Sequence, residues 1–369
     1  MFLGGASPLE TAEIRIPSLR GALRWWYRAL LSGQGLDMTA LREKEARVFG
    51  GVGSAASPSG SNKANAAGQA SSVRLRLSNN ILPYDIDSNE EGQNTLCSRS
   101  NSEGMKYLWH FMEAHTEGNR PYIKPGATFQ VVATAFPGDE EALVEMTKAM
   151  WLLSFLGGLG ARSRRMAGAF RVSIAKAVGV SDLPMFEPNN SHRFDGWFQK
   201  ELGSVLSLQD DPHSSLLEKG LPILHPDHAY ICRFSSRPNW REAVNKAGKK
   251  YKAFRDDSDV KTHEKVTLGL PLPTGKHGSD TVEVRMRHGQ THGEAQTLER
   301  RASPLWLQAI HLHPGEDKRT AAIATVFGPS FAPPNVQIVD SGRLLSTTPL
   351  DVGKSFLDNA DTKEPYLSA

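Results

Sequence analysis

Residues 17–31 read Pro-Ser-Leu-Arg-Gly-Ala-Leu-Arg-Trp-Trp-Tyr-Arg-Ala-Leu-Leu and predict an amphipathic helix. Ser18 is placed to cap the first turn, and Gly33 stands where the helix should end. At about 100° per residue, one side of this helix collects the apolar side chains of Leu19, Ala22, Leu23, Trp26 and Leu30, with Tyr27 at its edge. This stripe predicts a helix that packs on a core.

The other side of the helix carries Arg20, Arg24 and Arg28 at a spacing of four, and residues 19–31 contain no Asp or Glu. Like charges at this spacing repel by about 0.2–0.5 kcal/mol per pair, and a polyanion would remove that cost. Trp25 projects from the same half, where its ring could stack on an unpaired base. An ordinary solvated face, with Trp25 covered by a loop or a neighbouring subunit, explains the pattern equally well.

Composition sets wide bounds on the function. The 369 residues, 39% of them hydrophobic, favour two domains of ordinary size. A net charge of +3 and a pI near 8.7 are mild, so any case for nucleic-acid binding rests on local clusters. Two cysteines, Cys97 and Cys232, argue against a disulfide framework and a cysteine-based zinc site. The sequence shows no apolar run long enough to cross a bilayer and no pattern of a secretory signal. We therefore expect a cytoplasmic protein that makes no contact with membranes.

Periodicity and turn residues predict alternating helices and strands along the chain. The expected helices are 40–48, 105–114, 139–155, 194–206 and 240–254, and the expected strands are 73–77, 127–136, 170–175, 230–234, 282–286, 305–311 and 320–326. The Gly/Ser/Ala/Asn tract at 50–72 is predicted to be a mobile surface excursion. Arg74 and Arg76 alternate with apolar residues and predict a second basic surface.

A glycine-rich loop follows the helix that begins at Asp139. Its glycines are Gly157, Gly158, Gly160 and Gly168, and its arginines are Arg162, Arg164 and Arg165. Glycines allow positive φ and close approach of the backbone, so the amides could hold phosphates together with the arginines. The loop is not a nucleotide-binding fingerprint, because it lacks the G-x-x-x-x-G-K-[ST] pattern and follows a helix.

Residues 2–6, 13–28 and 157–168 resemble the RAMP superfamily of CRISPR systems, and more narrowly the first-subunit family of the Cmr (type III-B) effector complex. Residues 268–271 and 300–305 are similar to motifs from the C-terminal half of that family. The resemblance implies an α+β fold with two ferredoxin-like (RRM-like, βαββαβ) domains, long loop insertions and the glycine-rich loop. We place the domains at 1–178 and 179–369.

The resemblance further implies a non-catalytic, RNA-binding role in antiviral defence, with the crRNA 3′ region or the 5′ part of the target RNA as ligand and other Cmr subunits as partners. It implies no cofactor, no metal and no small-molecule substrate. The residues expected to bind RNA are Arg15, Arg20, Arg24, Trp25, Arg28, Arg162, Arg164, Arg165, Arg300 and Arg301.

Two departures from the family pattern alter these expectations. Family members begin with a strand ahead of the motif at 2–6, so the first strand is expected to be shortened. They more often have glycine directly after the arginines of the loop, where this chain has Met166 and Ala167, so the geometry of close approach is expected to differ.

Other readings concern histidines and lysines. His225, His228 and Cys232 have a spacing that suggests a metal, but the sequence offers no evident fourth ligand. His311 or His313 could serve acid–base chemistry, so the runner-up function is a metal-independent endoribonuclease that processes guide RNA. A third alternative is a scaffold whose charged faces, including the basic helix at 240–254, contact only proteins.

Overall fold

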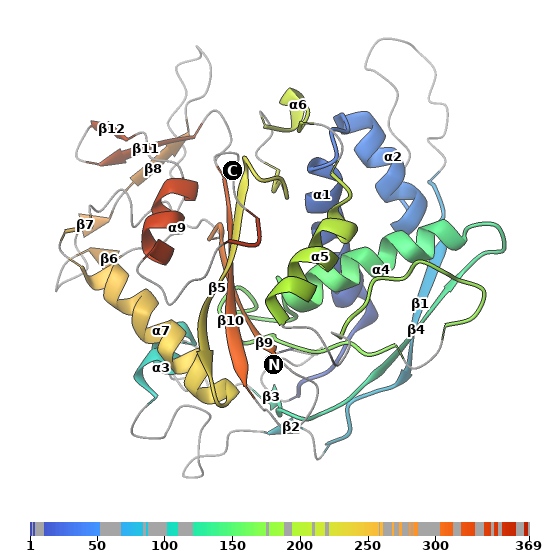
Figure 1. Ribbon diagram of the computed structural model, residues 1–369, viewed down its shortest axis with the longest axis horizontal. Coiled ribbons are helices and arrows are strands. Elements are labelled where there is room, and N and C mark those ends of the chain that lie inside the picture. The colour runs from blue at the N-terminus through green and yellow to red at the C-terminus, as the bar shows by residue number, and fades with distance from the viewer. Residues whose placement is uncertain are drawn as a thin grey trace.

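The computed structural model has an α+β fold in which helices cover both faces of a central antiparallel sheet (Figure 1). The structure describes residues 1, 3, 11–51, 68–83, 86–87, 102–109, 121–174, 177–187, 194–208, 211–217, 221–257, 259–260, 268, 273–274, 280–281, 283–286, 303–312, 319–328, 336–340, 343–345, 349–358 and 365–367. Among these residues, none of the helices combines the length and the apolar run needed to cross a lipid bilayer.

The helices agree closely with the sequence periodicity. They are α1 (Ile16–Ser32), α2 (Met38–Phe49), α3 (Glu103–Leu108), α4 (Glu140–Phe155), α5 (Phe194–Leu206), α6 (Ser214–Leu217), α7 (Trp240–Asp256) and α9 (Pro349–Asp358). The sequence analysis missed α6 and α9 and extended α3 to residue 114, into a stretch outside the described residues.

The strands form one central sheet and several small ones. They are β1 (Val73–Asn79), β2 (Ile86–Asp87), β3 (Tyr122–Ile123), β4 (Gln130–Ala135), β5 (Ala229–Arg237), β6 (Pro273–Thr274), β7 (Asp280–Thr281), β8 (Glu283–Met286), β9 (Leu305–His311), β10 (Thr320–Phe327), β11 (Val336–Asp340) and β12 (Arg343–Leu345). The central sheet has the order β5-β10-β9, and β10 is antiparallel to both neighbours. The remaining sheets have the orders β1-β4, β12-β11-β8, β2-β3 and β6-β7.

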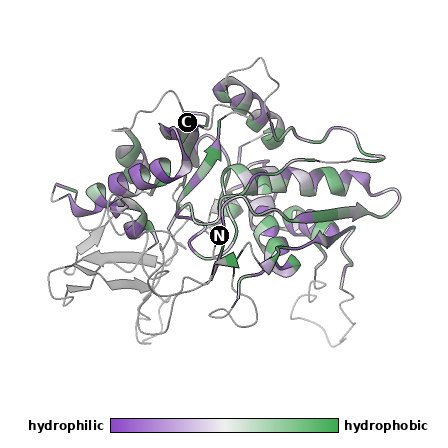
Figure 2. Cartoon of the chain, turned by 90° about the horizontal axis from the view of Figure 1, so that it is seen from below, coloured by the Kyte–Doolittle hydropathy of each residue, from purple (hydrophilic) through white to green (hydrophobic). Residues whose placement is uncertain are grey.

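The central sheet is buried on both faces because alternate residues of its strands enter two different cores. Ile231, Trp306 and Ile323 belong to a first core with α1, α4 and α5. Cys232 and Leu307 belong to a second core with α3, α7 and α9. Figure 2 shows hydrophobic and hydrophilic residues alternating along the helical ribbons, as expected for helices with one buried face. Both cores draw residues from either side of position 178, and the domain division there stays a prediction.

Helix α1 forms as its apolar stripe predicts, but it begins earlier than expected. Its N-cap position is Arg15 and Pro17 lies in the first turn, so the prediction that Ser18 caps the helix is wrong. Proline suits a first turn because its fixed φ is helical and its missing N–H would have no intrahelical partner there. The predicted end is confirmed, since Gly33 is the C-cap and donates to the carbonyl of Leu30 at 3.0 Å.

Two strand predictions are wrong in instructive ways. Residues 170–174 form no strand, because the segment that bonds to the edge of β9 is Arg164–Met166, several residues earlier. The strand expected at 127–136 exists as β4 but is not buried: its residues are exposed or half-buried. Within the described residues, β4 pairs with β1 alone, so the ladder ends there.

Helices α3 and α7 cross at a contact that only glycine permits. A Cβ on Gly248 would overlap the backbone carbonyl of Gly104, and a Cβ on Gly104 would overlap the backbone of Asn245. The Asn245 side chain accepts from the Gly104 amide at 2.8 Å and so caps the start of α3. This crossing ties α3, from the first half of the chain, to α7.

We expect Gly248→Ala to destabilise the protein by about 2–3 kcal/mol, because the backbone on the other side of the overlap cannot rotate away. The matched control is Gly196→Ala in α5, where a Cβ would meet nothing within 4 Å and helix propensity should add about 0.5–1 kcal/mol of stability. Denaturant unfolding measures both changes. Equal free energies of unfolding for the two variants would contradict this account of the crossing.

Candidate nucleic-acid interface

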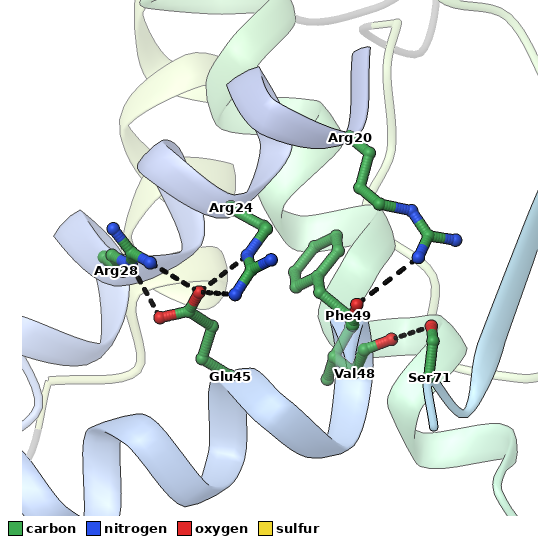
Figure 3. Close-up of polar contacts among 7 residues, drawn as sticks. All are labelled: Arg20, Arg24, Arg28, Glu45, Val48, Phe49 and Ser71. Atoms are coloured by element: carbon green, nitrogen blue, oxygen red, sulfur yellow. Dashed lines mark hydrogen bonds and ion pairs between the residues drawn. The ribbon is translucent and has the colours of Figure 1, made fainter. Parts of the chain in front are cut away.

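The arginine stripe of α1 has a carboxylate partner on α2 (Figure 3). Arg24 donates from Nε to Glu45 Oε1 at 2.7 Å, and Arg28 donates to both Glu45 oxygens at 2.5 and 2.7 Å. Arg20 lies further along and donates to the Phe49 carbonyl at 3.3 Å. The expectation that these arginines lack a counter-charge of their own is therefore wrong for Arg24 and Arg28, because the partner comes from the next helix.

One carboxylate serves two guanidinium groups in this cluster. The Glu45 side chain is 5% exposed, whereas Arg24 and Arg28 are 34% and 43% exposed. Burial acts to raise the pKa of Glu45, but the hydrogen bonds from Arg28 and Arg24 outweigh it and hold that pKa below its ordinary value of 4.5. Glu45 is thus ionised at neutral pH, and the two arginines keep a net positive charge and a solvent-facing edge.

Trp25 does not project freely from the polar half of α1. Its ring is half-buried and packs against Trp26, Trp306 and Phe327, with ring centroids 4.9, 4.8 and 5.5 Å away. The alternative expected a loop or a neighbouring subunit to cover Trp25, whereas the covering residues come from the strands β9 and β10. Trp25 faces the glycine loop, and the Arg164 guanidinium lies 5.9 Å from its ring centroid.

The glycine loop needs its glycines for close packing. A Cβ on Gly157 would overlap the indole of Trp26, and a Cβ on Gly168 would overlap the backbone of Leu159. The Leu159 amide donates to the Gly168 carbonyl at 3.0 Å, which closes the loop at its base. Gly158 packs on Gly168, and Gly160 takes a φ of +85°.

The turn of the loop places two ordinary residues in the left-handed region. Arg162 has a φ of 58° and Met166 a φ of 66°. Met166 stands directly after the arginines, the position where the resembling family more often has glycine. Each such residue costs about 1 kcal/mol or more of backbone strain. The turn is held at the edge of the central sheet, since Met166 donates to the Leu307 carbonyl and Leu307 donates to the Arg164 carbonyl, both at 3.1 Å.

Arg164 and Arg165 reach across to the second half of the chain. Arg164 donates to the Ser303 carbonyl at 2.6 Å, and its guanidinium lies 4.5 Å from the ring centroid of Trp306. Arg165 donates to the Tyr251 hydroxyl at 2.9 Å and lies 4.5 Å from the centroid of that ring. These carbonyl and aromatic contacts orient the two cations but do not neutralise them.

The surroundings of the loop disfavour the charged forms of Arg162 and Arg164. Burial and, as a smaller cause, the charge of Arg165 together lower the pKa of Arg164 to about 10. The same two causes, in the same order, lower the pKa of Arg162. The loop therefore holds a compact group of partly desolvated cations that repel one another, and an anion placed beside them would relieve this repulsion.

A cavity of about 360 Å³ opens between α1 and the glycine loop. Trp25 and Trp306 line it with indole surface, and Gly158 and Gly160 line it with backbone. The structure thus brings Trp25 and the glycine loop together, although more than 130 residues separate them. Arg24 and Arg28 lie apart from this cavity, because they point to α2 (Figure 3).

The remaining predicted residues are scattered. Arg15 forms an exposed ion pair with Glu13 at 3.4 Å. Arg300 and Arg301 lie outside the described residues, as do His313 and most of the tract at 50–72. Arg74 and Arg76 are exposed on β1, as the alternation predicts.

Two other groups named from the sequence are tied into local contacts. Lys252 of the basic helix forms an ion pair with Glu103 at 2.8 Å. One positive charge of α7 is therefore balanced by a carboxylate of α3. His311 lies at the end of β9, four residues or about 13 Å along the strand from the loop contact at Leu307.

Three residues of the site were not identified from the sequence: Glu45, Tyr251 and Trp306. Glu45 is an acid in a charged helix, and sequence spacing does not show that its carboxylate is buried. Trp306 did carry a signal, because a large aromatic directly follows the motif at 300–305, which the family resemblance had already singled out.

The sequence is similar to the RAMP superfamily and to Cmr1 subunits of CRISPR systems. A model of the RAMP superfamily matches residues 1–171. The CRISPR system Cmr subunit Cmr1-1 of Pyrococcus furiosus is 25% identical over 312 residues, which cover 82% of this chain and 78% of that protein. Cmr1-2 of the same organism is 27% identical over 185 residues, which cover 48% of this chain and 92% of that protein.

A solved structure supports the fold. The crystal structure of Cmr1 from Pyrococcus furiosus in its apo form matches with a TM-score of 0.54 and 20% identity, covering 96% of this chain and 92% of that one. A chain of a type III-B Cmr-beta complex, bound to cognate target RNA and AMPPnP in the presence of ssDNA, matches with a TM-score of 0.45 and 12% identity, covering 97% and 96%.

We expect Glu45→Gln to lower the free energy of unfolding at pH 7 by about 1–2 kcal/mol, because it removes the charge that two half-exposed arginines share. Since the pKa of Glu45 is lower in the folded state, its contribution is present above pH 4.5 and disappears as the pH falls through the folded pKa. The difference between wild type and variant should therefore shrink below pH 4.5 in urea unfolding. Glu43→Gln, on the exposed side of α2, should change little. A pH-independent difference would show that the ion pairs are not its source.

Proposed function

We propose that this chain is a Cmr1-like member of the RAMP superfamily and serves as a non-catalytic RNA-binding subunit of a type III-B CRISPR (Cmr) ribonucleoprotein effector. Its RNA ligand is the crRNA 3′ region or the 5′ part of the target RNA. The proposal extends to a fold of two ferredoxin-like domains, which the β5-β10-β9 order with α7 connecting β5 to β9 supports for the second half.

The glycine loop is the observation that carries this proposal. It gathers Arg162, Arg164 and Arg165 on one turn, where burial and mutual repulsion lower the pKa values of Arg162 and Arg164. A phosphate is the group that best offsets such a charge, since it accepts forked hydrogen bonds from guanidinium groups. The cavity beside the loop adds the indole surfaces of Trp25 and Trp306, on which a base can stack.

In this mechanism the protein holds the RNA strand and leaves sequence recognition to base pairing between guide and target. The loop cations bind backbone phosphates, and Arg24 and Arg28 extend the positive surface through the edges that Glu45 leaves open. Since the loop alone offers only a few charges, affinity for RNA should be weak in the isolated chain and strong in the assembly.

The alternative of a guide-processing endoribonuclease has one observation in its favour. Burial, together with the charge of Arg171, lowers the pKa of His311, so this imidazole is neutral at pH 7 and could act as a base. Against it, His311 lies at the far end of β9 from the glycine loop, and its Nδ1 lies 3.5 Å from the Thr320 hydroxyl on the neighbouring strand.

We expect Arg164→Ala combined with Arg165→Ala to weaken RNA retention in the assembled complex and to flatten its salt dependence. Losing two phosphate contacts to single-stranded RNA should reduce the slope of log K against log salt by about 1.4. Filter binding across a salt series measures the slope. An unchanged slope would remove the loop from the interface.

Because both arginines also contact the second half of the chain, two controls accompany that pair. Arg164→Lys with Arg165→Lys keeps the charge but loses the guanidinium hydrogen bonds to Ser303 and Tyr251, and should retain most of the slope. Arg42→Ala with Lys44→Ala removes two exposed cations of α2 and should leave the slope unchanged.

The purified chain should not cleave CRISPR repeat RNA in EDTA. Cleavage that is lost in His311→Ala, while a Thr320→Val variant remains active, would favour the endoribonuclease instead. Denaturing gels of end-labelled RNA decide between the two outcomes.

A further inference from the structure

A turn before β5 gathers metal-binding side chains that play no part in the proposed function. His225 and Asp227 lie two residues apart on this turn, and Asp211 approaches them from the segment before α6. One ligand atom from each of the three lies within 4.8 Å of the others. The sequence analysis had set the His225 and His228 spacing aside for want of another ligand, and Asp211 and Asp227 supply two.

The turn fixes the relative position of two of these ligands. The amides of His228 and Ala229 donate to the His225 carbonyl at 2.9 and 2.8 Å, which closes the turn. His225 Nδ1 lies 3.5 Å from Asp227 Oδ2. Two ligands bound about 2.1 Å from a tetrahedral zinc ion lie about 3.4 Å apart, so this pair already has the separation that one shared ion requires.

The charge of this cluster also suits a cation. His225 Nδ1 accepts from the Asp227 amide at 3.3 Å, and an ion bound at Nδ1 would replace this hydrogen bond. The His225 side chain is only 12% exposed, which shields the pair on one side. The two carboxylates give the cluster a negative charge, which complements a divalent ion.

His228 provides a second, independent observation. Its Nδ1 is buried and has no hydrogen-bond partner among the described residues. Its ring centroid lies 6.0 Å from that of His225. Buried polar atoms without partners are rare and often mark an absent ion or water. Cys232, by contrast, is buried on β5 in the second core and is not part of the cluster.

We propose that Asp211, His225 and Asp227 bind a divalent transition-metal ion of the zinc class, with His228 or water completing the coordination. The ion would join the segment that leads into α6 to the turn that starts β5, and would therefore fix one end of the central sheet. The donor set of imidazole and carboxylate favours zinc over magnesium, which prefers oxygen ligands alone. The site is separate from the RNA surface proposed above, so either proposal can fail without the other.

Isothermal titration of the untagged full chain with zinc chloride tests this site. We expect one zinc ion per chain, bound with micromolar or tighter affinity and competed poorly by magnesium. Asp211→Asn and His225→Gln should each weaken zinc binding at least about tenfold, since each removes a ligand. His213→Gln, two residues from Asp211 but outside the cluster, is the matched control and should bind zinc as the wild type does.

Thermal unfolding gives a second readout that does not depend on titration heats. Zinc should raise the Tm of the wild type and of His213→Gln but not that of the double variant Asp211→Asn with His225→Gln. Absence of zinc binding by the wild type at these concentrations would overturn the proposal, as would equal affinity in the double variant.

Discussion

The fold depends on the contact between the glycine loop and the edge of β9. Arg164 and Met166 exchange backbone hydrogen bonds with Leu307, so a turn from the first half of the chain extends a sheet from the second half. Gly157 and Gly168 let the same loop pack closely on Trp26 and on the backbone of Leu159. The same backbone segment also sets the direction in which the loop arginines point. The contact that joins the two halves of the chain therefore also positions the positive charges of the loop.

The two arginine clusters illustrate opposite electrostatic solutions. On α1, a buried carboxylate pairs with Arg24 and Arg28, and its lowered pKa shows that both charges gain from the arrangement. In the loop, the pKa of Arg164 moves down, so its charged form is disfavoured there. The α1 cluster contributes to stability, whereas the loop cluster costs stability in the isolated chain. Binding of an external anion would therefore stabilise the loop cluster more than the α1 cluster.

Local patterns predicted most elements of the fold, because helix period and strand alternation depend on burial of one face. The bounds of α5, α7 and β9 follow the sequence closely. The predictions that were wrong concern segments whose structure depends on contacts with residues far away in the sequence. Residues 170–174 alternate like a strand, but the edge of β9 already bonds to the segment Arg164–Met166. Strand β4 is apolar, yet its residues are exposed or half-buried. For the site, arginine spacing located the loop, but the partners Glu45 and Trp306 are brought near only by tertiary packing.

The places where the loop breaks local rules are themselves informative. Met166 and Arg162 adopt positive φ without being glycine, and three arginines share one turn with partial burial. Each feature costs free energy, and glycine at position 166 would avoid part of that cost. The arginine side chains also pack on the second half of the chain, but their contacts to Ser303, Trp306 and Tyr251 supply no negative charge. The proposed function would explain this turn: a ribose-phosphate strand would compensate the charge, and its bases would stack on the adjacent indoles.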